Sequence, residues 1–297
     1  MSSPVIELRN ISKIYRMSQT VSVEALKDVN VKIYPGEIVI IMGPSGSGKS
    51  TFLNIVGTLD RPTSGRVYLD GVDVTDLPER ELYDIRLRKI GFVFQFFNLI
   101  STLTAIENVM LPMILLGELS EKEARERALE LLKIVGLGDR INSRPIQMSG
   151  GQQQRVAIAR ALANNPSIVL MDEPTGNVDV VSEAIILKLI SILNKYFGVT
   201  FVIVTHNPEV SVIGHRIIYI RGGRLFETKE VPKISLDQPI DERRIIRSEL
   251  KFLKLELVRL RKELHKGIIS RDEYLARARE IEEKVHRIRR LISNAGK

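Results

Sequence analysis

The stretch GPSGSGKS (43–50) decides the fold of this 297-residue chain. The apolar run EIVIIM (37–42) precedes it, and KSTFLNIVG (49–57), which has the pattern of a helix, follows it. A strand, a glycine-rich turn and a helix in this order form a phosphate-binding loop, because the glycines let backbone N–H groups surround phosphate oxygens. We expect Lys49 to neutralise the β- and γ-phosphates of a nucleotide and the Ser50 hydroxyl to ligate Mg²⁺. The other loop residues expected at the phosphates are Gly43, Pro44, Ser45, Gly46, Ser47, Gly48 and Thr51.

Strand-like and helix-like segments alternate on both sides of this loop. Such alternation predicts an α/β domain with a largely parallel sheet. Two further predicted helices are EARERALELLKIVG (123–136) and QQQRVAIARALA (152–163). The other predicted strands are VIEL (5–8), RVYL (66–69), IGFVF (90–94), SIVLMD (167–172), TFVIVT (200–205) and RIIYI (216–220).

Two adjacent acids end one of these strands. Asp172 closes the strand, where a carboxylate suits Mg²⁺ coordination, and Glu173 follows it, where it can orient or activate an attacking water. Adjacent acids after a strand also occur in a solvated turn or at the N-cap of the next helix. The phosphate-binding loop in the same chain favours the catalytic interpretation.

A second candidate anion site lies at MSGGQQQR (148–155), where a Ser-Gly-Gly turn begins a predicted helix. Free backbone N–H groups point outward at such a helix start. One chain therefore carries two candidate phosphate sites, and the second requires an explanation.

The order of these motifs, with the isolated His206 after TFVIVT, resembles the ATPase subunits of ABC transporters over residues 4–230. The resemblance implies a P-loop NTPase fold of the ABC type, with a mixed-sheet core, an antiparallel β subdomain and a helical subdomain at about residues 96–160. Four segments are most similar to the group that serves lipoprotein release, macrolide export and bacterial cell division. They are SGSGKSTFLNIVGTLDRPTSG (45–65), GFVFQFFNLISTLTAIENV (91–109), GQQQRVAIARALANNP (151–166) and DEPTGNVD (172–179).

The resemblance also implies a use for the second phosphate site. In ABC ATPases two subunits pack head to tail, so that the Ser-Gly-Gly turn of one faces the phosphate loop of the other with ATP between them. Here Ser149, Gly150, Gly151 and Gln152 would complete the site of a second copy, and Asp179 would lie in the loop that crosses the interface. We therefore expect a homodimer with ATP and Mg²⁺ in two composite sites; the alternative is that the turn only begins a helix.

Four further positions follow from the resemblance. Tyr15 stands where these ATPases hold an aromatic ring against adenine, although a core aromatic at a strand end fits the position as well. Gln95 matches a glutamine that contacts Mg²⁺ and senses the membrane partner, unless it is a plain surface glutamine. His206 matches the switch histidine that contacts the γ-phosphate. Asn207 replaces the usual aspartate, which puts one capping or interface contact in doubt.

The net charge of +8 is concentrated in the tail of the chain. Residues 231–297 contain 18 Lys and Arg against 11 Asp and Glu, which leaves a charge of only +1 for residues 1–230. A nearly neutral body does not favour nucleic-acid binding. No apolar run reaches about 18 residues and MSSPVIELRN lacks a signal-peptide pattern, so we expect a cytoplasmic protein that meets the membrane through a partner.

The tail is predicted to be a linker (231–240) followed by a helical hairpin (241–297). Gly267 suits a helix C-cap, and Ser270 with Glu273 makes a capping box for a second helix. The hairpin either remains solvated or docks on its own body, on a second subunit or on the membrane partner. Its two heptad seams are Ile246, Leu250, Leu253, Leu257, Leu260 and Leu264, and Tyr274, Ala278, Ile281, Val285, Ile288 and Ile292.

The predicted function is that of an ATP-hydrolysing subunit that drives a separate transmembrane permease, in an export or mechanotransmission system. Two alternatives remain: a cell-division-type ABC ATPase that signals without moving a solute, and a soluble ABC protein that acts on ribosomes or DNA. The apolar cluster Phe96, Phe97 and Leu99 either lines the groove for the membrane subunit or packs inside the body.

Overall fold

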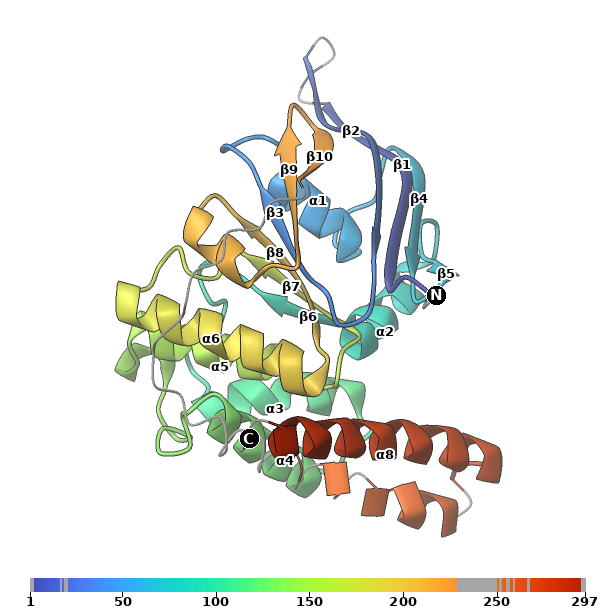
Figure 1. Ribbon diagram of the computed structural model, residues 1–297, viewed down its shortest axis with the longest axis vertical. Coiled ribbons are helices and arrows are strands. Elements are labelled where there is room, and N and C mark those ends of the chain that lie inside the picture. The colour runs from blue at the N-terminus through green and yellow to red at the C-terminus, as the bar shows by residue number, and fades with distance from the viewer. Residues whose placement is uncertain are drawn as a thin grey trace.

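The computed structural model describes residues 3–16, 18, 21–228, 250, 253–254, 257–258, 260–265 and 268–294. Two sheets and a set of helices form the body (Figure 1). The larger sheet has the strand order β10-β9-β3-β8-β7-β6, and β3 lies between β8 and β9 with parallel pairing to both. The largely parallel sheet is confirmed, with β10 added antiparallel to β9. Its strands are β3 (Ile38–Met42), β6 (Ile90–Val93), β7 (Ile168–Asp172), β8 (Thr200–Thr205), β9 (Arg216–Arg221) and β10 (Arg224–Thr228).

The smaller sheet is antiparallel and has the order β2-β1-β4-β5. It gives the mixed core and antiparallel subdomain expected for this fold. The predicted strand at residues 5–8 proves to be the beginning of a much longer one, and β2 and β5 were not predicted. The four strands are β1 (Ile6–Arg16), β2 (Ser22–Ile33), β4 (Ser64–Leu69) and β5 (Val72–Asp73).

The helices begin where the sequence supplies caps. Thr104 with Glu107 and Ser120 with Glu123 form complete capping boxes at the starts of α3 and α4. The longer helices are α1 (Lys49–Val56), α2 (Glu79–Lys89), α3 (Ala105–Leu116), α4 (Glu121–Ile134), α5 (Gly150–Ala161), α6 (Val180–Phe197) and α8 (Arg271–Asn294). Two short 3₁₀ helices are η1 (Pro145–Gln147) and η2 (Pro208–Ile213). No helix in the described ranges is long and apolar enough to cross a membrane.

The central strand β3 is buried on both faces, as a parallel strand between two layers must be. Ile38, Ile40 and Met42 point into the core beneath α4, α5 and α6. Val39 and Ile41 point into the opposite core, which α1 and the antiparallel sheet complete. The phosphate loop therefore follows directly from the carboxyl end of a rigid, buried strand.

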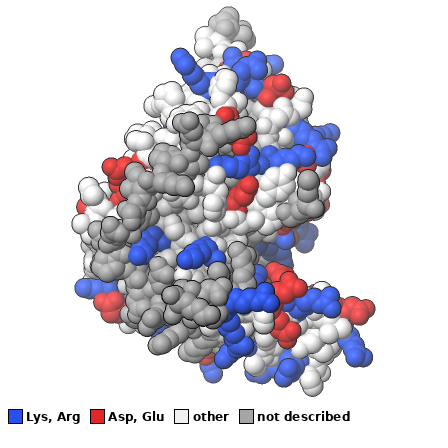
Figure 2. Space-filling model, viewed as in Figure 1, with Lys and Arg blue, Asp and Glu red and all other residues white. Residues whose placement is uncertain are grey.

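The described part of the tail packs on the body beside α4 and α6 (Figure 1). Leu253, Leu260, Ile281 and Ile288 are buried in the same core as the helices of the body. Basic and acidic side chains are interspersed over this region (Figure 2). Among the docking sites considered from the sequence, the structure therefore shows the chain's own body. The predicted linker 231–240, Ile246 and Gly267 lie outside the described residues.

Candidate functional site

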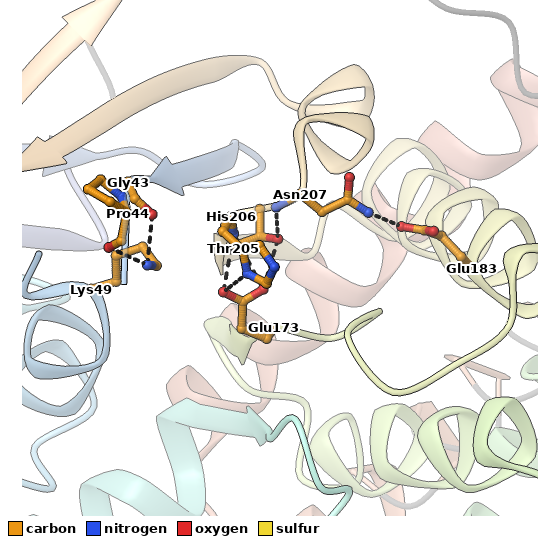
Figure 3. Close-up of polar contacts among 8 residues, drawn as sticks. All are labelled: Gly43, Pro44, Lys49, Glu173, Glu183, Thr205, His206 and Asn207. Atoms are coloured by element: carbon orange, nitrogen blue, oxygen red, sulfur yellow. Dashed lines mark hydrogen bonds and ion pairs between the residues drawn. The ribbon is translucent and has the colours of Figure 1, made fainter. Parts of the chain in front are cut away.

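The loop between β3 and α1 requires glycine at two positions because neighbouring backbone is close. A Cβ on Gly48, whose φ is 108°, would lie 2.3 Å from the carbonyl oxygen of Ala25, and one on Gly43 would lie 2.3 Å from that of Ile220. The Lys49 ammonium folds back and donates to the Gly43 and Pro44 carbonyl oxygens at 2.8 and 3.0 Å (Figure 3). The cation is thus held at the mouth of the loop.

A cavity of about 800 Å³ opens above this loop. The structure therefore brings together most of the residues predicted for one nucleotide site. The sequence did not predict the contribution of β2 (Val23, Glu24, Ala25 and Lys27) or of the β9–β10 turn (Gly222 and Gly223). The predicted residues in the lining are Tyr15, Pro44, Ser45, Gly46, Ser47, Gly48, Lys49, Ser50, Thr51, Gln95, Asp172, Glu173 and His206.

One end of the cavity has oxygen donors suited to a hard cation. Burial raises the pKa of the Asp172 carboxyl, a hydrogen bond from Ser50 opposes this rise, and the charge of Glu173 adds to it. A carboxylate beside a hydroxyl, at the phosphate loop, fits Mg²⁺, which is bound by few protein oxygens together with phosphate oxygens and water. The residues present therefore fit this cation.

Glu173 has a left-handed backbone, with φ of 46°, and its side chain turns toward the end of β8 (Figure 3). Its carboxylate accepts hydrogen bonds from the Thr205 hydroxyl at 3.1 Å and the His206 backbone N–H at 3.1 Å, and it lies 2.8 Å from His206 Nδ1. The Glu173 side chain is only 12% exposed, whereas that of His206 is 68% exposed. The acid is therefore fixed in place, and the histidine faces the cavity.

The loop after β6 carries Gln95 and is held by hydrogen bonds to two of its backbone carbonyl oxygens. Asn177 donates to the Gln95 carbonyl oxygen at 2.9 Å, and the Arg160 guanidinium of α5 donates to that of Phe97 at 2.9 Å. Phe96 is 73% exposed, whereas Leu99 packs against the core, so the apolar cluster is not buried as one unit.

Tyr15 is half-buried at the wall of the cavity. Its hydroxyl donates to the Asp60 carboxylate at 2.8 Å, and the Lys13 ammonium lies 4.9 Å from its ring centroid. The same ammonium donates to Asp60 at 2.6 Å. The ring therefore has a fixed orientation and belongs to the cavity wall.

Ser149 and Asp179 lie apart from this cavity. Ser149 caps α5, where its hydroxyl accepts from the Gln152 N–H at 3.3 Å and the Gln152 side chain accepts from the Ser149 N–H at 3.0 Å. Asp179 caps α6 and accepts from the Ser182 N–H at 2.9 Å. Among the residues that the structure describes, the cavity lining contains none of Ser149, Gly150, Gly151, Gln152 or Asp179.

The two helix starts contact each other. A Cβ on Gly151 would lie 2.2 Å from the Ser182 hydroxyl oxygen, and one on Gly150 would lie 2.9 Å from the Asn177 carbonyl oxygen. Within one chain, the two candidate phosphate sites are therefore separate, and the Ser-Gly-Gly turn is adjacent to the beginning of α6.

Asn207 makes the capping contact that its replacement of aspartate had put in doubt. Its side-chain oxygen accepts from the Glu209 N–H at 2.9 Å, at the start of η2. Its amide nitrogen donates to the Glu183 carboxylate at 2.7 Å. No sequence pattern indicates this second bond, because Glu183 lies on α6.

Comparisons with known proteins agree with this geometry. Residues 26–176 match the family model described as ABC transporter. The chain is 54% identical to the uncharacterised ABC transporter ATP-binding protein MJ0796 of Methanocaldococcus jannaschii, over 74% of this chain and 95% of that protein. It is 45% identical to the lipoprotein-releasing system ATP-binding protein LolD 2 of Caulobacter vibrioides, over 76% and 98%. A dimeric post-hydrolysis structure of MJ0796 bound to ADP and Pi superposes with a TM-score of 0.70 at 51% identity, over 77% and 99%.

Proposed function

The chain belongs to the ABC transporter family as an ATP-binding and ATP-hydrolysing subunit, and from this premise we propose that two copies close head to tail over two ATP molecules. One observation carries the proposal. Lys49, Asp172, Glu173 and His206 meet at one cavity, whereas the Ser149 turn is a separate anion site on the same chain. In a head-to-tail pair, each ATP contacts the cavity of one chain and the Ser149 turn of the other.

Within its own cavity each chain holds the nucleotide. The backbone N–H groups of residues 45–51 and the Lys49 ammonium bind the phosphates, and the Tyr15 ring stacks on adenine. Ser50, Asp172 and Gln95 would hold Mg²⁺, which would neutralise charge on the phosphate oxygens. The family resemblance supports these assignments, and so does the presence of all these residues in the cavity lining or the phosphate loop.

Hydrolysis needs a base close to the γ-phosphate. Glu173 accepts a proton from the attacking water as the water oxygen bonds to the γ-phosphorus and the bond to ADP breaks. His206 contacts the γ-phosphate and, through its hydrogen bonds, keeps the Glu173 carboxylate oriented. The fixed position and small exposure of Glu173 support this assignment.

The second copy completes the site. Ser149, Gly150, Gly151 and Gln152 offer the γ-phosphate a hydroxyl, N–H groups and the positive end of α5, while Asp179 lies in the loop that crosses between the copies. The dimeric structure of the similar cassette, bound to ADP and Pi, supports this arrangement. Closure therefore follows ATP binding, and reopening follows hydrolysis.

The proposed partner is a separate transmembrane permease, which places this subunit on the inner face of the membrane. The loop after Gln95, with Phe96 exposed beside it, would pass the closing motion to that partner. Similarity to a lipoprotein-releasing ATPase supports an export or mechanotransmission system.

Replacing the base tests the composite site. Glu173→Gln should retain ATP binding and lose most turnover, so that MgATP traps the dimer. Size-exclusion chromatography with and without MgATP measures this, and wild-type protein is the control. A variant that binds ATP and remains monomeric contradicts head-to-tail closure.

Mixed dimers test which chain supplies each group. Ser149→Arg and Lys49→Ala should each abolish hydrolysis alone. In a mixed dimer, one composite site carries both defects and the other carries neither, so mixing should restore part of the activity. Mixed dimers that form without any recovery would show that each chain hydrolyses alone.

A further inference from the structure

The Asn207 side chain bridges two elements of the site (Figure 3). Its oxygen accepts from the Glu209 N–H at 2.9 Å, and its amide nitrogen donates to Glu183 at 2.7 Å. Its backbone N–H donates to the Thr205 hydroxyl oxygen at 3.0 Å. The residue therefore joins the end of β8 to α6.

On the β8 side, the contacts continue into the catalytic groups. The Thr205 hydroxyl donates to Glu173 at 3.1 Å, and the His206 N–H donates to the same carboxylate at 3.1 Å. Asn207 is the residue directly after His206. Asn207 is therefore connected to Glu173 through the Thr205 hydroxyl and to His206 through the chain.

On the α6 side, the contacts continue to the Ser-Gly-Gly turn. Glu183 lies in the first turn of α6, where its N–H donates to the Asp179 carbonyl oxygen at 2.8 Å. The next residue toward the cap, Ser182, leaves no room for a Cβ on Gly151. The start of α6 is thus packed directly against the start of α5.

We propose that the Asn207–Glu183 hydrogen bond links the two nucleotide sites of the dimer. It ties the loop of His206, which serves the chain's own ATP, to the helix start beside Ser149, which serves the ATP of the second copy. The proposal rests on the composite sites proposed above. Asn207 is accordingly a positioning residue, which acts on hydrolysis through His206 and Glu173.

The bond requires an amide at position 207. An aspartate there would still cap η2, because that contact uses an oxygen as acceptor, but it would place a second carboxylate against Glu183. Asn207→Asp therefore removes the link and retains the cap. Combining it with Glu183→Gln restores the bond with donor and acceptor exchanged.

The experiment compares ATPase kinetics of four proteins: wild type, Asn207→Asp, Glu183→Gln and the double variant. Asn207→Asp should lower kcat about three- to thirtyfold, which lies within the range of couplings between contacting residues, with the KM for ATP nearly unchanged. Glu183→Gln should remain close to wild type, because an amide oxygen still accepts from Asn207. The double variant should recover most of the lost kcat.

Two further variants complete the design. Glu209→Gln changes an exposed carboxylate in η2, two residues after Asn207, and should leave kcat unchanged. Glu183→Leu removes the acceptor without a charge clash, so it should reproduce the loss even if Asn207→Asp does not fold.

The outcomes separate the two proposals. Wild-type kcat in Asn207→Asp, a loss that the double variant does not recover, or an equal loss in Glu183→Gln would overturn the link. Glu173→Gln is measured in parallel, and normal turnover in that variant would overturn the proposed function itself.

Discussion

Tyr15 is oriented before any base arrives, because Asp60 binds its hydroxyl and the Lys13 ammonium lies close to its ring. Stacking of a base on an aromatic ring contributes about 1–3 kcal/mol and accepts any base. Tyr15→Leu should therefore weaken the binding of ATP and of GTP by this same amount. Tyr15→Phe retains the ring and should lose much less binding free energy. Calorimetric titration measures both nucleotides, with Tyr83→Leu on α2 as the control. Unchanged ATP affinity in Tyr15→Leu would exclude stacking.

Single residues were predictable where the backbone itself imposes a rule. Only glycine fits at position 48, because a Cβ there would clash with Ala25. The loop must therefore contain glycines at fixed positions, and this pattern is visible in the sequence. The pairing of Glu173 with His206 was not predictable in the same way. Both residues were expected at the site, but their contact depends on β7 lying beside β8, which is a property of the sheet and not of either motif.

At the scale of elements, the start of α6 depends on an ionised cap. The backbone and side-chain hydrogen bonds from Ser182 lower the pKa of Asp179 below that of an unfolded aspartate, about 3.9. This stabilisation is complete above the unfolded pKa and is lost as pH falls through the lower pKa of the folded state. Asp179→Asn has no carboxylate to titrate, so its stability relative to wild type should rise as pH falls below about 4. Urea unfolding of both proteins from pH 7 to 3 measures this, and a constant difference would contradict it.

Burial against the body holds the described part of the tail in place. Leu260 is 2% exposed in the core shared with the body, whereas Leu275 on α8 is 53% exposed. Leu260→Ala should lower the free energy of unfolding by about 2–5 kcal/mol, and Leu275→Ala by less than about 0.5 kcal/mol. Chemical denaturation measures both. Equal effects would show that the tail does not share the body's core in solution.

Five of the six strands of the larger sheet were predictable because each is a short, mainly apolar run, whereas β10, with the sequence RLFET, was not predicted. β2 was not predictable, since its buried residues Leu26, Val29 and Ile33 are spaced three and four apart, which is the spacing of a helix. The irregular spacing has a structural cause, because the pairing of β1 with β2 shifts register three times. Bulges therefore conceal this strand from a search for alternation.

At the scale of the molecule, the described part of the tail packs on the body, and none of its residues lines the nucleotide cavity. A chain of residues 1–232 should therefore still bind and hydrolyse ATP, while its thermal midpoint falls because Phe197 and Val199, which adjoin the tail, become more exposed. The measurement compares the ATPase rate and the thermal unfolding midpoint of the truncated chain with those of the full-length protein. Loss of hydrolysis in a folded truncated chain would make the tail part of the catalytic unit.

The central position of β3 sets the order of events during synthesis on the ribosome. Its last residue is Met42, and both of its partners, β8 and β9, begin only at Thr200 and Arg216. At about 5–20 residues per second, the strand that carries the phosphate loop waits roughly 8–32 s for its first neighbour. The nascent chain therefore has no completed nucleotide site until more than two thirds of it has been translated, which delays any ATP-driven pairing of copies until the sheet can close.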